Sequence, residues 1–160
     1  MAGRILQELK QTKPFPTLET EAIVNLHRTM DVVDRELEMF LKPYGISTTQ
    51  YNVLRILRGV YPAGLKCSEI GERMVAHDPD ITRLLDRIEK RGLIERAREE
   101  KDRRVVRTKI SGEGLALLAR MDQPVEEGSR RILGHLGPER LTQLIELLEA
   151  ARDIPRRKLI

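Results

Sequence analysis

Aromatic residues are scarce in this sequence: it contains no tryptophan, and Phe and Tyr together make up 3% of its 160 residues. The core must therefore be built mainly from aliphatic side chains, which favours helices. Hydrophobic residues make up 40% of the chain and charged residues 34%. This is enough apolar material for one folded domain, or for one core with helical extensions, and too much for a disordered chain.

Cysteine and long apolar segments are also nearly missing. Cys67 is the sole cysteine, so no disulfide can form within the chain. The first ten residues contain no apolar stretch of signal-peptide length. No window approaches the roughly 20 apolar residues that a membrane span needs. We therefore expect a cytoplasmic protein.

The residue groupings that carry catalysis or bind metals do not stand out either. There is no evident nucleophile–base pair, phosphate-binding loop or carboxylate pair, so we expect neither an enzyme nor a cofactor. His27, His77 and His135 are scattered, without Cys or acidic residues at metal-ligand spacing, which argues against a metal site. Cys67 lacks a second cysteine to resolve an oxidised form, and a buried structural role is the better interpretation.

The chain does contain a regular series of amphipathic segments. Ser47, with Gln50 three residues later, forms a capping box that opens a helix. Ser111 is placed to cap a further long helix, which Pro124 should kink. Apolar spacings of three and four, interrupted by Pro and Gly, predict the remaining helices. The expected helical segments are 18–42, one from 47, 68–75, 79–91, one from 111, and 138–152, and 1–17 is expected to be a short helix or arm followed by an extended linker.

The segment 79–91 is the most informative helix. Asp78 is expected as its N-cap and Pro79 in its first turn, where a missing N–H is harmless. Opposite its apolar stripe, polar residues recur at i, i+3, i+7 and i+10, and three of the four are cationic. Such a basic flank suits the major groove of DNA, where Arg can bond bidentately to guanine. The four residues are Asp80, Arg83, Arg87 and Lys90, while Asp86 and Glu89 fall on the other flank.

After Gly92 the apolar period changes from 3.6 to 2, which predicts a β-hairpin with strands at 93–98 and 104–110. Val106, Thr108 and Ile110 should share the inward face. Between Arg96 and Lys109 there are seven Lys or Arg and three acidic residues, an excess of +4 that equals the net charge of the chain. A solvated charged hairpin would look the same by composition, but its place after a basic helix favours DNA.

These segments together resemble the MarR family of bacterial transcription regulators. The resemblance is carried by HDPDITRLLDRIEKRGLIERAREEKDRRVVRTKISGEG at 77–114, with its Gly-Leu helix ending and D-R-R wing tip. STTQYNVLRIL at 47–57 and CSEIGERM at 67–74 match the preceding two helices. The resemblance implies a mainly α fold with a two-stranded β wing, a winged helix-turn-helix flanked by N- and C-terminal dimerisation helices.

The resemblance also implies a set of DNA-binding residues. Arg104 would reach the minor groove, where an Arg feels enhanced negative potential, and Asp102 would hold it in place. Pro79 and Asp80 differ from the polar residues common there in the family, so base preference does not transfer. The implied DNA-binding residues are Pro79, Asp80, Thr82, Arg83 and Arg87 on the helix, and Asp102, Arg103 and Arg104 at the wing tip.

By the same resemblance, 1–42 and 112–160 are two parts of a helical dimerisation region, and 43–111 is the DNA-binding region between them. The expected protein is a homodimeric, sequence-specific regulator of a pseudo-palindromic operator, and a repressor that responds to a small effector, whose binding residues are unknown. One alternative is a winged-helix module that binds a protein and not DNA. Another is a basic membrane-surface protein, which would need an exposed apolar face opposite its basic residues. In this chain, that apolar face is expected to form the core.

Overall fold

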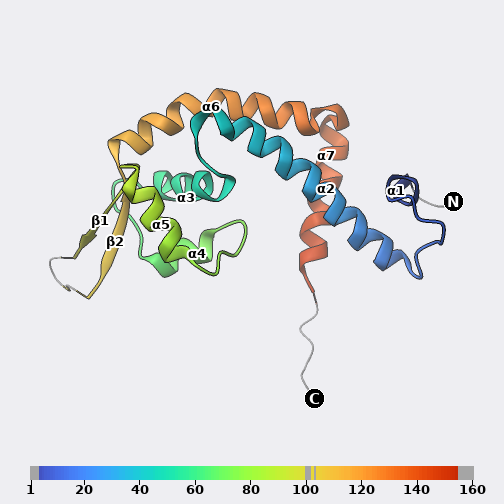
Figure 1. Ribbon diagram of the computed structural model, residues 1–160, viewed down its shortest axis with the longest axis horizontal. Coiled ribbons are helices and arrows are strands. Elements are labelled where there is room, and N and C mark those ends of the chain that lie inside the picture. The colour runs from blue at the N-terminus through green and yellow to red at the C-terminus, as the bar shows by residue number, and fades with distance from the viewer. Residues whose placement is uncertain (1–3, 100–101, 103, 155–160) are drawn as a thin grey trace, which may run out of the picture. The chain divides into compact units, whose positions relative to one another are not determined.

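The computed structural model describes residues 4–99, 102 and 104–154 (Figure 1). The chain divides into two compact units, Met1–Arg120 and Met121–Ile160. The elements are α1 (Arg4–Glu8), α2 (Leu18–Leu41), the 3-10 turn η1 (Lys42–Tyr44), α3 (Thr48–Gly59), α4 (Cys67–Arg73), α5 (Ile81–Lys90), β1 (Ile94–Arg98), β2 (Val106–Ile110), α6 (Gly112–Leu133), η2 (Gly134–Leu136) and α7 (Gly137–Arg152).

Helices α3, α4 and α5 and the hairpin β1–β2 form what we call the winged core, in the first unit (Figure 1). Their apolar side chains pack together and are almost fully removed from solvent, as aliphatic patterning predicts. This arrangement confirms the expected fold class, a mainly helical chain with a two-stranded wing. The side chains at its centre are Val53, Leu54, Leu57, Ile70, Leu84, Leu85, Ile88 and Ile94, each at most 2% exposed.

Side-chain caps set the helix starts. Ser47 accepts a hydrogen bond from the Gln50 amide, and the Gln50 side chain accepts one from the Ser47 amide, so the predicted capping box at α3 is present. Ser111 Oγ accepts from the Gly114 amide at 3.0 Å, which caps α6. Helix α6 then continues through Pro124 to Leu133. The caps satisfy amides that the first helical turn would otherwise leave unpaired.

The two strands pair antiparallel, with Ile94 opposite Ile110 and Arg98 opposite Val106. Leu65 adds a single bridge to Thr108 on the outer side of β2. Gly64, just before it, has φ +74°, and a Cβ there would lie 2.6 Å from the Thr108 carbonyl oxygen. Only glycine therefore fits where this loop crosses the strand.

One prediction for the hairpin was wrong. Thr108 and Ile110 are buried as expected, but Val106, on the same face of β2, is 42% exposed. The alternation of the strand is intact, and the core beneath it ends before Val106 is reached. Period-2 patterning identifies the face of a strand and does not say how far the core extends under it.

The long helices differ from the winged core in their burial. Leu41 is the one buried residue of α2, and α7 has none. Ile23 is 55% exposed, Met39 58% and Leu147 68%. No helix within the described residues is both long and apolar enough to cross a membrane.

Candidate nucleic-acid interface

The start of α5 is built by two aspartates in succession. Asp78 Oδ1 accepts a hydrogen bond from the Asp80 amide at 2.8 Å, and Asp80 Oδ1 accepts from the Arg83 amide at 3.3 Å. Asp80 is therefore the N-cap, and the prediction of Asp78 was wrong. The Asp78 carboxylate is used in a tight Asx turn, which places Pro79 before the helix and starts α5 at Ile81.

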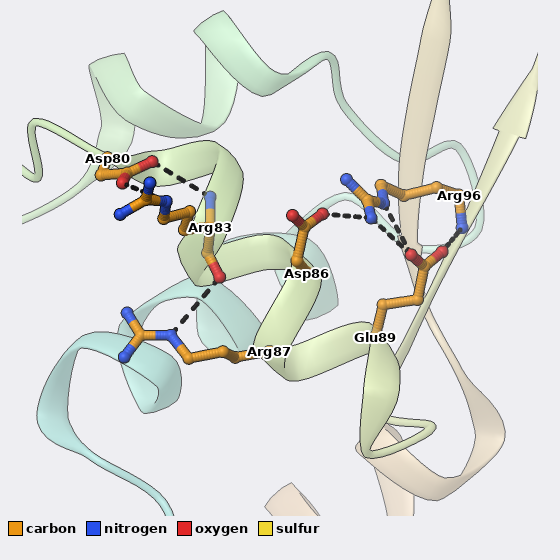
Figure 2. Close-up of polar contacts among 6 residues, drawn as sticks. All are labelled: Asp80, Arg83, Asp86, Arg87, Glu89 and Arg96. Carbon is orange, nitrogen blue, oxygen red and sulfur yellow. Dashed lines mark hydrogen bonds and ion pairs between the residues drawn. The ribbon is translucent and has the colours of Figure 1, made fainter.

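The predicted basic flank of α5 is exposed along its length. Arg83 pairs with Asp80, with 3.1 Å between Nε and Oδ2, and its side chain remains 82% exposed (Figure 2). Arg87 folds back along the helix, its Nε donating to the Arg83 carbonyl at 3.4 Å. Thr82 and Lys90 are also exposed. The flank thus presents cations to solvent, with Asp80 holding the first of them.

The other flank of α5 is not free, because β1 covers it with a cation. Arg96 Nη2 lies 2.5 Å from Asp86 Oδ1 and 2.5 Å from Glu89 Oε2 (Figure 2). The hydrogen bonds from Arg96 hold the pKa of the Glu89 carboxyl below its ordinary value. Those that Glu89 accepts raise the pKa of Arg96 in turn. The acidic flank, Asp86 and Glu89, is thereby paired within the chain.

The charge excess of the hairpin is smaller at the surface than the sequence indicates. Arg107 forms an ion pair with Glu99, and its Nη1 donates to the Gly64 carbonyl at 3.3 Å. Arg96 is held by α5. Among the hairpin cations that the structure describes, Arg96 and Arg107 are therefore engaged in the protein, while Arg98 and Lys109 on the strands are exposed. A count of charges along a hairpin cannot separate these two groups.

At the wing tip, Asp102 organises the backbone next to Arg104. Asp102 Oδ1 accepts from the Arg104 amide at 3.0 Å, and the Asp102 carbonyl accepts from the Val105 amide at 2.9 Å. Asp102 therefore contacts the main chain of Arg104, whereas the resemblance implied that it holds the Arg104 side chain. The Arg104 side chain is exposed and makes no ion pair among the described residues. Arg103, also predicted for this site, lies outside the described residues.

Two contacts that support α5 were missed by sequence reasoning. Arg91, just after the last turn of α5, donates from Nη1 to the Gly45 carbonyl at 2.6 Å. Asn52 Oδ1 accepts from the Val75 amide at 2.9 Å and so anchors the loop between α4 and α5 to α3. The partners lie 46 and 23 residues apart, and no local pattern could have indicated them.

Among the described residues, no group of three or more His, Cys, Asp or Glu could hold a metal ion. Cys67 is partly exposed at the first turn of α4, where the sequence favoured a buried side chain. What the site offers is an exposed basic flank on one helix and an exposed arginine on an adjacent wing. Three helices, a wing and this charge distribution define the winged helix-turn-helix class of DNA-binding proteins.

Comparisons with known proteins agree with this class and narrow it. The family model described as "MarR family" matches residues 46–106. The HTH-type transcriptional regulator PecS of Dickeya dadantii is 30% identical over 147 residues, which cover 90% of this chain and 88% of that protein. The chain belongs to the MarR family, as the resemblance in its sequence indicated, and it is a transcription regulator and not an enzyme.

Solved structures show the same fold. A MarR transcription factor from Planctomyces limnophilus is 40% identical, with a TM-score of 0.66 over 85% of this chain and 98% of that chain. A mutant MarR from Escherichia coli, complexed with operator DNA, is 26% identical, with a TM-score of 0.75 over 87% of this chain and 99% of that one. The fold of this chain is therefore one that has been seen bound to an operator.

Proposed function

We propose that this protein is a homodimeric repressor that binds a pseudo-palindromic operator and releases it in response to a small effector. The observation that carries the DNA-binding part is the exposed basic flank of α5, next to a wing with an exposed Arg104. A helix with this flank can enter the major groove, and a basic wing can follow the adjacent minor groove. A protein of this function acts beside the chromosome, in agreement with the expected cytoplasmic location.

The residues divide into two groups by the groove that they would contact. Arg83, near the N-terminus of α5, is the candidate for reading a base, and Asp80 orients its side chain through their ion pair. Pro79, Thr82 and Arg87 would lie beside it. In the minor groove we place Arg104, with Asp102 setting the turn before it. Arg103 is proposed as a further DNA contact from its place in the sequence alone.

Two observations support the dimer. Helix α2 leaves Ile23, Met30 and Met39 more than half exposed, and α7 leaves Ile145 and Leu147 more than half exposed. Apolar faces of this kind mark interaction surfaces on soluble domains. A second copy of the chain is the proposed occupant, with 10–42 and 112–160 forming the interface, because two recognition helices are what a pseudo-palindrome requires.

Repression and effector response are supported by relatives more than by geometry. One relative, 28% identical over 109 residues, is the homoprotocatechuate degradative operon repressor of Escherichia coli. A small acidic or phenolic effector fits this proposal, acting by changing the spacing of the two recognition helices. An effector that binds the DNA-free form more tightly must lower DNA affinity by the same factor.

The test is selection of bound duplexes from a random pool by the wild-type protein. Two inverted half-sites about 10 bp apart, centre to centre, are expected. Selected and random duplexes are then titrated at two salt concentrations, and affinity should fall as salt rises. No binding of either duplex would contradict the proposal and favour a protein-binding module. A single unpaired half-site would contradict the dimeric arrangement.

A further inference from the structure

One residue of the wing, Arg96, makes four separate contacts with α5 (Figure 2). Its amide donates to Glu89 Oε1 at 3.1 Å, and its Nε donates to Glu89 Oε2 at 2.9 Å. Its Nη2 donates to Glu89 Oε2 and to Asp86 Oδ1, both at 2.5 Å. Both oxygens of Glu89 are thus used by a single residue of β1, through its main chain and its side chain.

These contacts fix the base of the wing to the recognition helix. Only Arg91, Gly92 and Leu93 connect α5 to β1, so the angle between them depends on contacts formed across the junction. Arg96 pairs with Thr108 in the sheet, and Arg104 lies four residues before Thr108, in the turn that precedes β2, which is at most about 13 Å at 3.3 Å per residue. A rotation of about 10° at Arg96 would then move Arg104 by about 2 Å, enough to break a hydrogen bond.

The contacts also make Arg96 a poor candidate for touching DNA directly. Its side chain is 25% exposed, compared with 82% for Arg83 on the basic flank. To reach a phosphate, the guanidinium would have to leave two carboxylates with which it forms charge-assisted hydrogen bonds. Those two carboxylates would then be left unpaired beside a polyanion.

We propose that Arg96 is a positioning residue for DNA recognition: through Glu89 and Asp86 it sets the wing at the angle at which α5 and Arg104 engage DNA together. The proposal rests on the DNA-binding function proposed above. It separates Arg96 from the exposed strand cations such as Arg98, which contribute charge alone. We call the contacts of Arg96 with Glu89 and Asp86 the lock. Affinity for random DNA, on which the wing can bind in any register, should not depend on the lock, whereas affinity for a selected operator should.

The experiment compares Arg96→Met with Arg98→Met. Arg98 is a matched control because it lies two residues along the same strand and on the same face, and is exposed without an ion pair among the described residues. Arg96→Met should weaken binding of the selected duplex by about tenfold and of random duplex by less than about twofold. Arg98→Met should weaken both by the same factor, as the loss of a phosphate contact does.

The ratio of the two affinities is the decisive readout, because partial unfolding lowers the active fraction equally for both duplexes. Glu89→Gln gives a second test, in which simple charge attraction and the proposal predict opposite changes. Coulomb attraction alone predicts tighter binding when an acid is removed, whereas loss of the lock predicts a lower ratio. Arg96→Met combined with Glu89→Gln should be little worse than Arg96→Met alone, since the two residues act as a unit. Arg96→Lys should restore the ratio in part.

Equal loss for both duplexes in Arg96→Met leaves the ratio unchanged and would overturn the proposal. Tighter binding by Glu89→Gln would overturn it as well. These outcomes all require wild-type protein that binds DNA. If the wild type binds neither duplex, the proposed function itself has failed, so the two failures are distinguishable.

Discussion

The winged core buries its apolar side chains, whereas the long helices α2 and α7 leave most of theirs exposed to solvent. In the winged core, Leu54, Ile70 and Ile88 are completely removed from solvent by neighbours in the same chain. In α7 no residue is buried, and Leu147 is 68% exposed. Three short helices and a hairpin can pack together and bury their apolar faces, whereas a long helix with few neighbours cannot cover its own. The winged core therefore buries its apolar side chains within one chain, and the long helices leave most of theirs exposed, as the proposed dimer would require.

The largest expected effect is a loss of stability in the winged core. Ile88→Ala removes a fully buried side chain from α5 and should lower the free energy of unfolding by about 2–5 kcal/mol. Chemical denaturation measured at several protein concentrations checks this. The difference from wild type should be independent of concentration if the winged core is complete in one chain. A difference below about 0.5 kcal/mol, the size typical of surface changes, would contradict the burial.

The next effect tests α7, which is part of the proposed dimer interface. Leu147→Asp places a charge on the exposed apolar face of α7 and should raise the dimer dissociation constant at least about 100-fold, or about 2.7 kcal/mol. Light scattering at micromolar concentration should then show monomer. Glu149→Asp, on the same helix and conservative in charge, serves as the control. A wild-type protein that is monomeric at micromolar concentration, with DNA binding intact, would contradict the dimer.

Arg83→Ala tests the exposed face of α5, whereas Ile88→Ala tests the buried face of the same helix. Arg83 is 82% exposed on its side chain, so the fold should be unaffected. If Arg83 reads a base, operator binding should weaken by about 1–3 kcal/mol and base preference should relax at one position. Selection repeated with the variant measures this. An equal loss for selected and random duplexes would make Arg83 a phosphate contact.

The wing tip offers a test of smaller expected size. Arg104→Ala should weaken operator binding by about 1–2 kcal/mol, with no loss of stability, because the side chain is exposed. Asp102→Ala should also weaken it, although it removes an acid near DNA. Asp102→Asn should retain most of the affinity, because its side-chain oxygen can still accept from the Arg104 amide.

A double variant shows whether the two wing-tip residues act together. Arg104→Ala with Asp102→Ala should be little worse than Arg104→Ala alone. Losses that simply add, or tighter DNA binding by Asp102→Ala, would mean that Asp102 does not act through Arg104. Equal losses in Asp102→Asn and Asp102→Ala would point to the charge of Asp102 and away from the turn.

The smallest expected effect is the pH dependence of the lock between wing and helix. Because the folded state lowers the pKa of Glu89, its ion pair stabilises the protein above the ordinary glutamate range. That contribution is lost as pH falls through the lowered pKa. It should stay below about 1 kcal/mol, since the pair is partly exposed to solvent. The difference in unfolding free energy between wild type and Glu89→Gln should shrink between neutral and acidic pH; a constant difference would exclude this ion pair as its source.

Much of the fold could be predicted because its signals are local. The capping box of Ser47 and Gln50 needs only a spacing of three residues. The basic flank of α5 follows from the 3.6-residue period once an apolar stripe defines the buried side. The alternation in β2 likewise identified the inward face, and Thr108 and Ile110 are buried on it.

The candidate site could be predicted only in part, because several of its contacts depend on competition between alternatives. Two aspartates could cap α5, and Asp80 does so because Asp78 is used in the turn before it. Arg96 and Arg104 are alike in sequence as hairpin cations, yet one faces two acids of α5 and the other faces solvent. Spacing along the chain does not distinguish them.

The sequence by itself determined which segments become helices and strands, which side of each is apolar, and where cations gather along the chain. These properties depend on neighbours within one or two turns, and the backbone geometry converts them directly into faces. Only the tertiary structure decided which charges remain available to a partner. Arg91 reaches Gly45 across 46 residues, and Arg107 reaches Gly64 across 43. Such pairs form only when packing has brought distant segments within hydrogen-bond distance. They distinguish the cations that are bonded within the protein from those that remain exposed for contact with DNA.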